Sequence, residues 1–137
     1  MSDKYLNTLI VSGDKAERER FKKDVDTGHD DDYLSLYNLL PIPKELNEKR
    51  DIRTWCERNW GTPCDVSAED RIETADELVY HLFGISSPPT LWLKTVSKKF
   101  PTLEFGIRYR DEYGDYPWTE VVVEKGKVKS TETASNN

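Results

Sequence analysis

The chain has 137 residues, of which 36% are hydrophobic and 34% are charged, and its formal net charge is -6. This length fits one domain with a single core. It contains no apolar run near the roughly 20 residues that a bilayer-spanning helix needs, and the start Met1-Ser2-Asp3-Lys4 lacks the layout of a secretory signal. The negative charge disfavours non-specific binding to nucleic acid or membranes, although a local basic patch would override it. We therefore expect one cytoplasmic domain, 1–130, followed by a disordered polar tail, 131–137.

The cysteine content excludes two further classes of protein. Cys56 and Cys64 are the only cysteines. Two cysteines are too few for a disulfide framework, and they lack the second ligand pair of a structural zinc site. We expect two reduced, largely buried thiols, and neither a metal nor another cofactor.

The first third of the chain alternates between extended and helical patterns. Tyr5–Ser12 is rich in β-branched and apolar residues and stops at a glycine, which predicts a first strand. Asp14, with Glu17 three positions later, predicts the start of a short amphipathic helix. A loop over 27–32 then leads to a predicted second strand, Tyr33–Leu40, which ends at a Pro-Ile-Pro sequence where backbone donors are lost.

The middle of the chain predicts two helices around two extended segments. Lys44–Trp60 fits a polar helix that ends at a Gly-Thr-Pro turn. The segments Cys64–Ala68 and Glu77–Ile85 look extended, and we expect them to pair as neighbours. Ser87-Pro88-Pro89 predicts the cap and first turn of a helix that ends at Pro101.

The last third predicts strands. Leu103–Tyr109 alternates with period two, and Trp118–Glu124 follows it after a predicted turn over 111–115, so the two segments form a hairpin. Lys125-Gly126 predicts a second turn into a short strand over 127–129. From Ser130 onward the sequence is that of a frayed polar tail.

The order of these elements indicates the fold class. It contains the split β-α-β pattern of a ferredoxin-like sheet. We therefore predict an α+β domain whose helices cover one face of an antiparallel sheet, with an inserted helix and a C-terminal β-hairpin extension.

Five short motifs run along nearly the whole chain in a fixed order. They are Asn7, Leu9 and Gly13; Leu39, Pro41 and Pro43; Asn59 to Thr62; Ser87 to Pro89; and Phe100, Pro101 and Leu103. In this order they resemble the YubB-type ferredoxin-like family of bacteriophage and conjugative-plasmid proteins, whose function is unknown. The resemblance implies the fold and an origin in a mobile genetic element, but no catalytic residue. The chain departs from the family pattern at Pro63, where members often have Lys, and at Ser86, where an aromatic is common, so a family surface there would be changed.

A tryptophan pair predicts a structural clamp. Trp55 and Trp60 precede the turn at Gly61. Indole rings bury large apolar areas and need one partner for the N–H group, so we expect this pair to fix how a helix end meets the sheet.

The candidate catalytic residues have simpler structural interpretations. His29 precedes three consecutive aspartates, 30–32, but consecutive residues rarely converge on one metal ion. His81 lies in a predicted strand, and a nucleophile-base pair of Cys56 with His81 would lack a positioning third group and an oxyanion hole. We expect a protein that is not an enzyme.

An acidic stretch is the first candidate for binding, and Arg71 is its only cation. The predicted partner-binding residues are Asp65, Glu69, Asp70, Glu73, Asp76 and Glu77. A negative face of this kind fits the basic groove of a nucleic-acid-processing enzyme. We predict a protein-interaction module of a phage or plasmid that inhibits a host defence system of the anti-CRISPR or anti-restriction type, with an ordinary solubilising surface as the alternative interpretation.

An aromatic and basic group near the predicted hairpin is the second candidate. Its residues are Arg108, Tyr109, Arg110, Tyr113 and Trp118. Sheets of this class can stack bases on aromatic side chains, so an RNA- or single-stranded-DNA-binding module is the alternative function. Tyr and Trp beside Arg also suit a protein interface, and an exposed sheet edge would allow a homodimer.

Overall fold

The computed structural model describes residues 5–83, 87–111 and 118–134 of the chain. Within these ranges the chain forms six strands and four helices. In chain order they are β1 (Tyr5–Gly13), α1 (Lys15–Val25), α2 (Leu36–Leu39), α3 (Lys49–Asn59), β2 (Ser67–Glu73), β3 (Glu77–Phe83), α4 (Thr90–Val96), β4 (Leu103–Asp111), β5 (Trp118–Glu124) and β6 (Lys127–Ala134).

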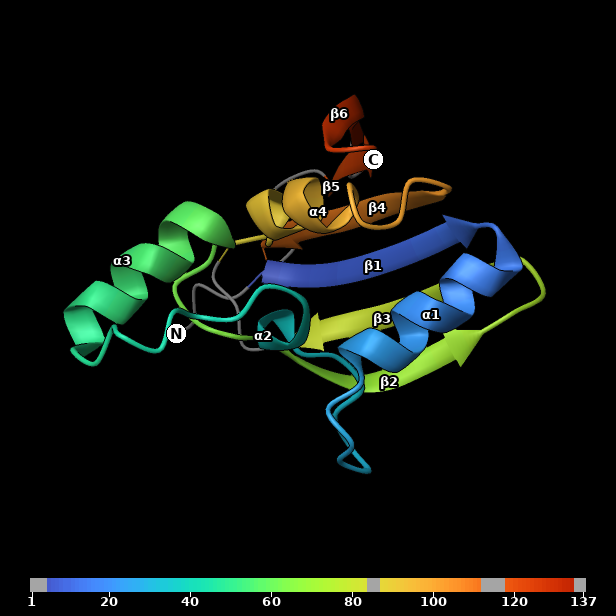
Figure 1. The fold of residues 1–137 in the computed structure, drawn as a ribbon. Coiled ribbons are helices and arrows are strands. Elements are labelled where there is room, and N and C mark those ends of the chain that lie inside the picture. Colours follow the sequence, from blue (N-terminus) through green and yellow to red (C-terminus); the bar gives the residue numbers. More distant parts are fainter. Residues whose placement is uncertain (1–4, 84–86, 112–117, 135–137) are drawn as a thin grey trace.

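The strands form one sheet in the order β2-β3-β1-β4-β5-β6, and every neighbouring pair is antiparallel. The helices α1, α2 and α4 lie on one side of this sheet, and α3 projects beyond its end (Figure 1). The fold is therefore α+β, and β5 and β6 extend the sheet past β4 as the hairpin pattern predicted.

The core lies between the sheet and these helices, and Phe21 of α1 is at its centre. The ring of Phe21 has edge-on contacts with Tyr80, Trp92, Phe100 and Phe105 at centroid distances of 5.3 to 6.4 Å. All five side chains are fully buried. One aromatic cluster thus joins α1, α4 and the strands β3 and β4.

The start of α1 follows from its sequence. The Asp14 carboxylate accepts a hydrogen bond from the Glu17 amide at 3.0 Å, which is the cap that the spacing predicted. Phe21 and Val25 are four positions apart, so they share the face that packs into the core. The charged residues between them are left on the outside.

The predicted second strand over Tyr33–Leu40 is wrong, because α2 occupies part of this segment. Leu36 and Leu39 are buried at helical spacing. The Asp65 carboxylate, from a distant part of the chain, accepts hydrogen bonds from the Leu36 amide at 2.8 Å and the Tyr37 amide at 3.2 Å. These bonds satisfy amides at the start of α2 that have no partner within the helix.

Several predicted boundaries also move. The helix expected from Lys44 begins at Lys49, and the extended segment expected over Cys64–Ala68 is a strand from Ser67 to Glu73. Helix α4 begins at Thr90, since the Ser87 hydroxyl donates to the Gly61 carbonyl at 2.7 Å and does not cap the helix.

The C-terminal strand is longer than predicted. β6 runs to Ala134 and pairs with β5 along its length, so the tail expected from Ser130 is wrong up to that residue. The remaining tail residues, 135–137, and most of the predicted turn, 112–115, lie outside the described residues.

The tryptophan clamp joins helices. Trp55 and Trp60 pack edge to face at 5.7 Å, and the indole N–H of Trp60 donates to the Leu40 carbonyl at 3.0 Å. The Trp92 amide donates to the Trp60 carbonyl at 3.2 Å. Gly61 has a φ of 87°, which lets the chain turn beside Pro88. The pair therefore fixes the end of α3 against the start of α4 and the end of α2, and not directly against the sheet.

Candidate interaction surface

The sheet has a second face on which no described helix packs. Side chains alternate along a strand, so Leu9 and Val11 point into the core while Thr8 and Ile10 point to the opposite side. We call this opposite side the open face. Its described side chains on the inner strands β3, β1 and β4 are Glu77, Val79, His81, Phe83, Thr8, Ile10, Ser12, Glu104, Arg108 and Arg110.

An apolar row crosses the open face from β2 to β5. Ile72 pairs with Val79, Val79 with Ile10, Ile10 with Gly106, and Gly106 with Val122. Ile72 is 47% exposed, and the three valine and isoleucine side chains in the middle are half-buried. Five strands thus place four branched apolar side chains in one line, with a glycine in its centre.

A polar row runs beside the apolar row, two residues away from it along each strand. His81 Nδ1 lies 2.9 Å from the Asp70 carboxylate, and Arg108 Nε lies 3.0 Å from Glu120. Thr8 lies between them, because it pairs with both His81 and Arg108. The row offers donors and acceptors of both charges next to the apolar line.

A third row, of polar and charged residues, borders the apolar row on its other side. Ser12 pairs with Glu77 and Glu104 across β3, β1 and β4. Lys129 Nζ lies 2.6 Å from Glu104 and 3.7 Å from Glu124. The hydrogen bond to Glu104 raises the pKa of Lys129. The open face therefore has an apolar centre and charged borders.

The six predicted acidic residues do not form one face. Asp65 caps α2 and also accepts from the Ser35 hydroxyl at 2.9 Å. Asp70 and Glu77 lie on the open face, whereas Glu73 points to the helix side and contacts Lys22 of α1 at 2.8 Å. The two remaining residues of the set, Glu69 and Asp76, are exposed.

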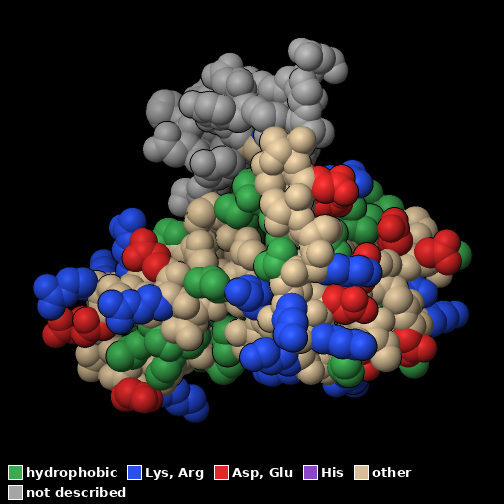
Figure 2. Space-filling model, turned by 90° about the horizontal axis from the view of Figure 1, so that it is seen from above, with side chains coloured by type: hydrophobic (Ala, Val, Ile, Leu, Met, Phe, Trp, Pro, Cys, Tyr) green, Lys and Arg blue, Asp and Glu red, His purple; other side chains and the backbone are tan. Residues whose placement is uncertain are grey.

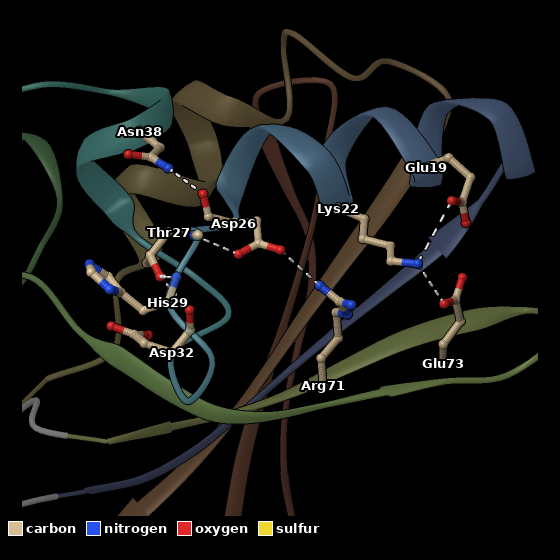
Figure 3. A network of polar contacts seen from close by, with 10 residues as sticks. Glu19, Lys22, Asp26, Thr27, His29, Asp32, Asn38, Arg71 and Glu73 are labelled. Carbon is tan, nitrogen blue, oxygen red and sulfur yellow. Dashed lines mark hydrogen bonds and ion pairs between the residues drawn. The ribbon is translucent and has the colours of Figure 1, made fainter.

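Figure 3 shows the ion pairs and hydrogen bonds of the acidic residues around α1 and β2. Lys22 lies between Glu19 and Glu73, and Arg71 contacts Asp26 at 3.3 Å. The hydrogen bond from Lys22 lowers the pKa of Glu73. These pairs attach α1 to the edge strand β2. Within the acidic stretch, Glu73 is therefore paired with a cation of the fold itself.

One of the three aspartates after His29 has a structural partner. The Asp32 carboxylate accepts from the Ala68 amide at 3.0 Å, and the Thr27 hydroxyl accepts from the His29 amide at 3.0 Å. Among the described residues, no three His, Cys, Asp or Glu side chains are grouped so that they could hold a metal ion.

The aromatic and basic group is divided between the two faces. Arg108 is on the open face, and Tyr109 packs against the core on the helix side. Arg110 lies on the same side of β4 as Arg108. Trp118 begins β5 and pairs with Ala134, and Tyr113 lies outside the described residues. The described members of the group thus do not form a continuous aromatic platform.

The structure also separates the two members of the hypothetical nucleophile-base pair. Cys56 is 1% exposed within the core, and its burial raises the pKa of the thiol, which disfavours the nucleophilic thiolate. His81 lies on the other side of the sheet. The second thiol, Cys64, is exposed, so the prediction of two buried cysteines is wrong for this residue.

The open face was missed in the sequence because it depends on register. The alternation in 77–83 and 103–111 indicated which residues leave the core. It did not show that β3 and β4 flank β1, which is what aligns Val79, Ile10 and Gly106. The structure shows Ile72 and Phe83 as exposed apolar side chains of this face.

Comparisons with known proteins place this fold near one solved structure. No family model matches the chain, and no curated protein matches it. The crystal structure of a protein api92 from Yersinia pseudotuberculosis, assigned to the family model DUF1281, has a TM-score of 0.51 and 12% sequence identity. The match covers 74% of this chain and 40% of that chain. At this identity the similarity concerns the fold alone.

None of the described helices is long and apolar enough to cross a membrane.

Proposed function

We propose that this chain is a non-enzymatic interaction domain that binds a protein partner through the open face of its sheet. The observation that carries the proposal is the in-register apolar row from Ile72 to Val122 on a face that no described helix covers. Protein interfaces commonly combine an apolar centre with a polar rim. The rows of charged and polar residues on both sides of this line supply such a rim.

The size of the open face suits this role. The five spacings between the six strands, at about 4.8 Å each, and seven residues at about 3.3 Å each give a flat area of about 550 Å². The accessible surface of a side-chain-covered face exceeds its flat area, and a standard protein interface buries about 800 Å² per partner. One face of the sheet is therefore large enough for a specific complex.

The proposal includes a finer fold assignment and an origin. The first four strands lie in the order β2-β3-β1-β4, with α1 in the connection from β1 to β2 and α4 in that from β3 to β4. This order supports a ferredoxin-like domain. Together with the five sequence motifs, it supports membership of a phage or plasmid family, and a host defence or nucleic-acid-processing protein is then the partner that we propose.

The geometry changes the surface that we propose, but not the class of function. Asp65 and Glu73 are engaged within the fold, which removes them from a continuous acidic face. The open face keeps both charges and an apolar centre, which fits a protein better than a bare phosphate backbone. We retain nucleic acid as the second candidate ligand of this face because Arg108 lies on it.

Affinity capture with two matched variants tests the proposal. Ile72→Lys places a charge in the apolar row, and Val128→Lys places the same charge on the edge strand β6 at a side chain that is 43% exposed on the helix side. The wild-type domain and both variants are immobilised and exposed to a bacterial lysate, with washes at low and high salt. Bound protein and nucleic acid are then identified.

The proposal expects one stoichiometric protein that survives the high-salt wash on the wild type and on Val128→Lys, but is lost from Ile72→Lys. A protein retained equally by all three baits would move the binding site away from the open face. Nucleic acid released at high salt, without a protein, would support the second candidate instead.

A further inference from the structure

Five basic residues come from three segments that contact one another near the end of α4, on the helix side of the molecule. We call this group the basic patch; it consists of Arg20, Lys94, Lys98, Lys99 and Lys125. It brings together three parts of the chain, namely α1, α4 with the turn that follows it, and the turn between β5 and β6. Figure 2 shows Lys and Arg side chains gathered near the middle of the face that is seen from above.

The residues that follow α4 contact the turn between β5 and β6, which carries Lys125. The Gly126 amide donates to the Ser97 hydroxyl at 2.8 Å. The carbon stem of Lys98 lies over Gly126 so closely that an added Cβ there would be 2.5 Å from Lys98 Cε. The glycine after Lys125 therefore lets the Lys98 side chain lie against this turn.

Arg20 of α1 contacts Lys99 in the turn that follows α4. The Arg20 guanidinium donates to the Lys99 carbonyl at 2.8 Å and lies 4.3 Å from the centre of the Phe100 ring. It also lies 3.3 Å from the Glu17 carboxylate, so the lysines supply the unpaired charge of the patch. Lys99 Nζ donates to the Leu39 carbonyl at 2.7 Å, which leaves two of its three N–H donors for a ligand. These contacts hold both cations in place.

Two lysines of the described chain are paired with carboxylates, and the lysines of the patch are among those that are not. Lys22 and Lys129 each contact two carboxylates. Within the described residues, no ion pair involves the four lysines of the patch. The acidic loop over 30–32 lies at the opposite end of the molecule from α4 (Figure 1), so its negative charge is far from the patch.

The residue before Gly126 is unusual for its position. Lys125 has a φ of 53° in a two-residue hairpin turn, where Asn, Asp or Gly are preferred. Asn, Asp or Gly would therefore stabilise this turn better than Lys125 does. The lysine adds an exposed positive charge to the turn that the Lys98 side chain contacts.

We propose that the basic patch binds the phosphate backbone of nucleic acid. Lysine is a flexible point charge that suits phosphates, and charge neutralisation with release of counterions drives such binding. Protein interfaces are depleted in Lys and enriched in aromatic anchors, so four lysines favour a polyphosphate over an acidic protein. Separation of charge within the molecule lets this patch act although the net charge of the chain is -6.

Salt-dependent binding tests this assignment with matched variants. The probes are a fluorescein-labelled 20-base DNA single strand and the corresponding duplex, and affinity is measured by anisotropy at several salt concentrations. Lys98→Gln/Lys125→Gln removes two charges from the patch, and Lys44→Gln/Lys49→Gln removes two from exposed positions around the start of α3. All four side chains are exposed, so the variants should fold, which circular dichroism checks.

We expect the patch variant to bind at least about tenfold more weakly near 0.1 M salt and to lose about 1.5 to 2 from the slope of log K against log salt, and the control variant to match the wild type. No measurable binding of either probe by the wild type, or equal weakening in both variants, would overturn the proposal. Polyglutamate displacing the DNA at equal charge concentration would also contradict it, in favour of a protein ligand. A failed capture at the open face leaves this test unaffected, because the two surfaces lie on opposite sides of the sheet.

Discussion

The two faces of the sheet are built from the same strands but from different kinds of residue. Along β3, Leu78 and Tyr80 on the helix side are fully buried, while Val79 and His81 between them lie on the open face and are only half-buried. Along β4, Phe105 and Ile107 alternate with Gly106 and the charged Arg108 in the same way. One face supplies most of the apolar burial, and the other retains apolar side chains that the described fold does not use.

The side chains that stabilise the fold therefore differ from those that are available to bind a partner. Burial of large side chains on the helix side provides the main free energy of folding. The apolar row of the open face contributes less to folding because each of its members keeps part of its contact with water. Four aligned apolar side chains on such a face are thus available to a partner.

Truncation at the centre of the helix-side core should have the largest effect. Phe21→Ala removes a ring that contacts four other buried rings and should lower the free energy of unfolding by about 3–5 kcal/mol. Urea denaturation measures this loss. A cost below about 1 kcal/mol would mean that the aromatic cluster is not the core that we describe.

Two neighbouring residues of β3 compare the faces directly. Leu78→Ala, on the helix side, should cost about 2–5 kcal/mol, and Val79→Ala, on the open face, should cost about 1 kcal/mol or less. Both are measured by urea denaturation of the isolated domain. Equal costs would indicate that the open face is as closely packed as the core.

Two members of the predicted acidic face should also differ. Asp65→Ala leaves the amides of Leu36, Tyr37 and Val66 without their acceptor and should cost about 1–3 kcal/mol. Glu69→Ala, at an exposed position, should stay within about 0.5 kcal/mol of the wild type. Similar thermal midpoints for both variants would contradict the capping role of Asp65.

A smaller effect concerns pH. Burial raises the pKa of Glu17, but hydrogen bonds from Thr102 and the charge of Arg20 outweigh it, so the pKa lies below the ordinary 4.5. A carboxylate with a lowered folded-state pKa stabilises the fold above pH 4.5, and this contribution is lost as the pH falls through the lowered value. The urea midpoint of Glu17→Gln should therefore fall less than that of the wild type between pH 5 and pH 3, and parallel curves would contradict this.

The local sequence pattern correctly predicted those helices and strands whose sequence signals lie within their own segments. The alternation in β3 and β4 and the Asp14 cap of α1 are of this kind. Helix α2 was not predictable, because its capping carboxylate, Asp65, lies 29 residues away from Leu36. The strand over 130–134 was missed because its polar residues pair only through the backbone of β5.

The candidate surfaces were harder to predict than the elements. The acidic stretch looked continuous in sequence, but alternation in β2 sends Asp70 and Glu73 to opposite faces. The basic patch could not be seen, because Arg20, Lys98 and Lys125 are far apart in the chain. Both outcomes depend on long-range packing, which composition and spacing do not record.

Nuclear magnetic resonance of isoleucine methyl groups, recorded as the captured partner is added, tests the binding role of the open face most directly. Ile10 and Ile72 report on the open face, and the fully buried Ile107 reports on the core. We predict that the Ile10 and Ile72 signals shift or broaden on addition of the partner while Ile107 stays unchanged. Unchanged Ile10 and Ile72 signals in a saturated complex would contradict the assignment of the open face as the binding surface.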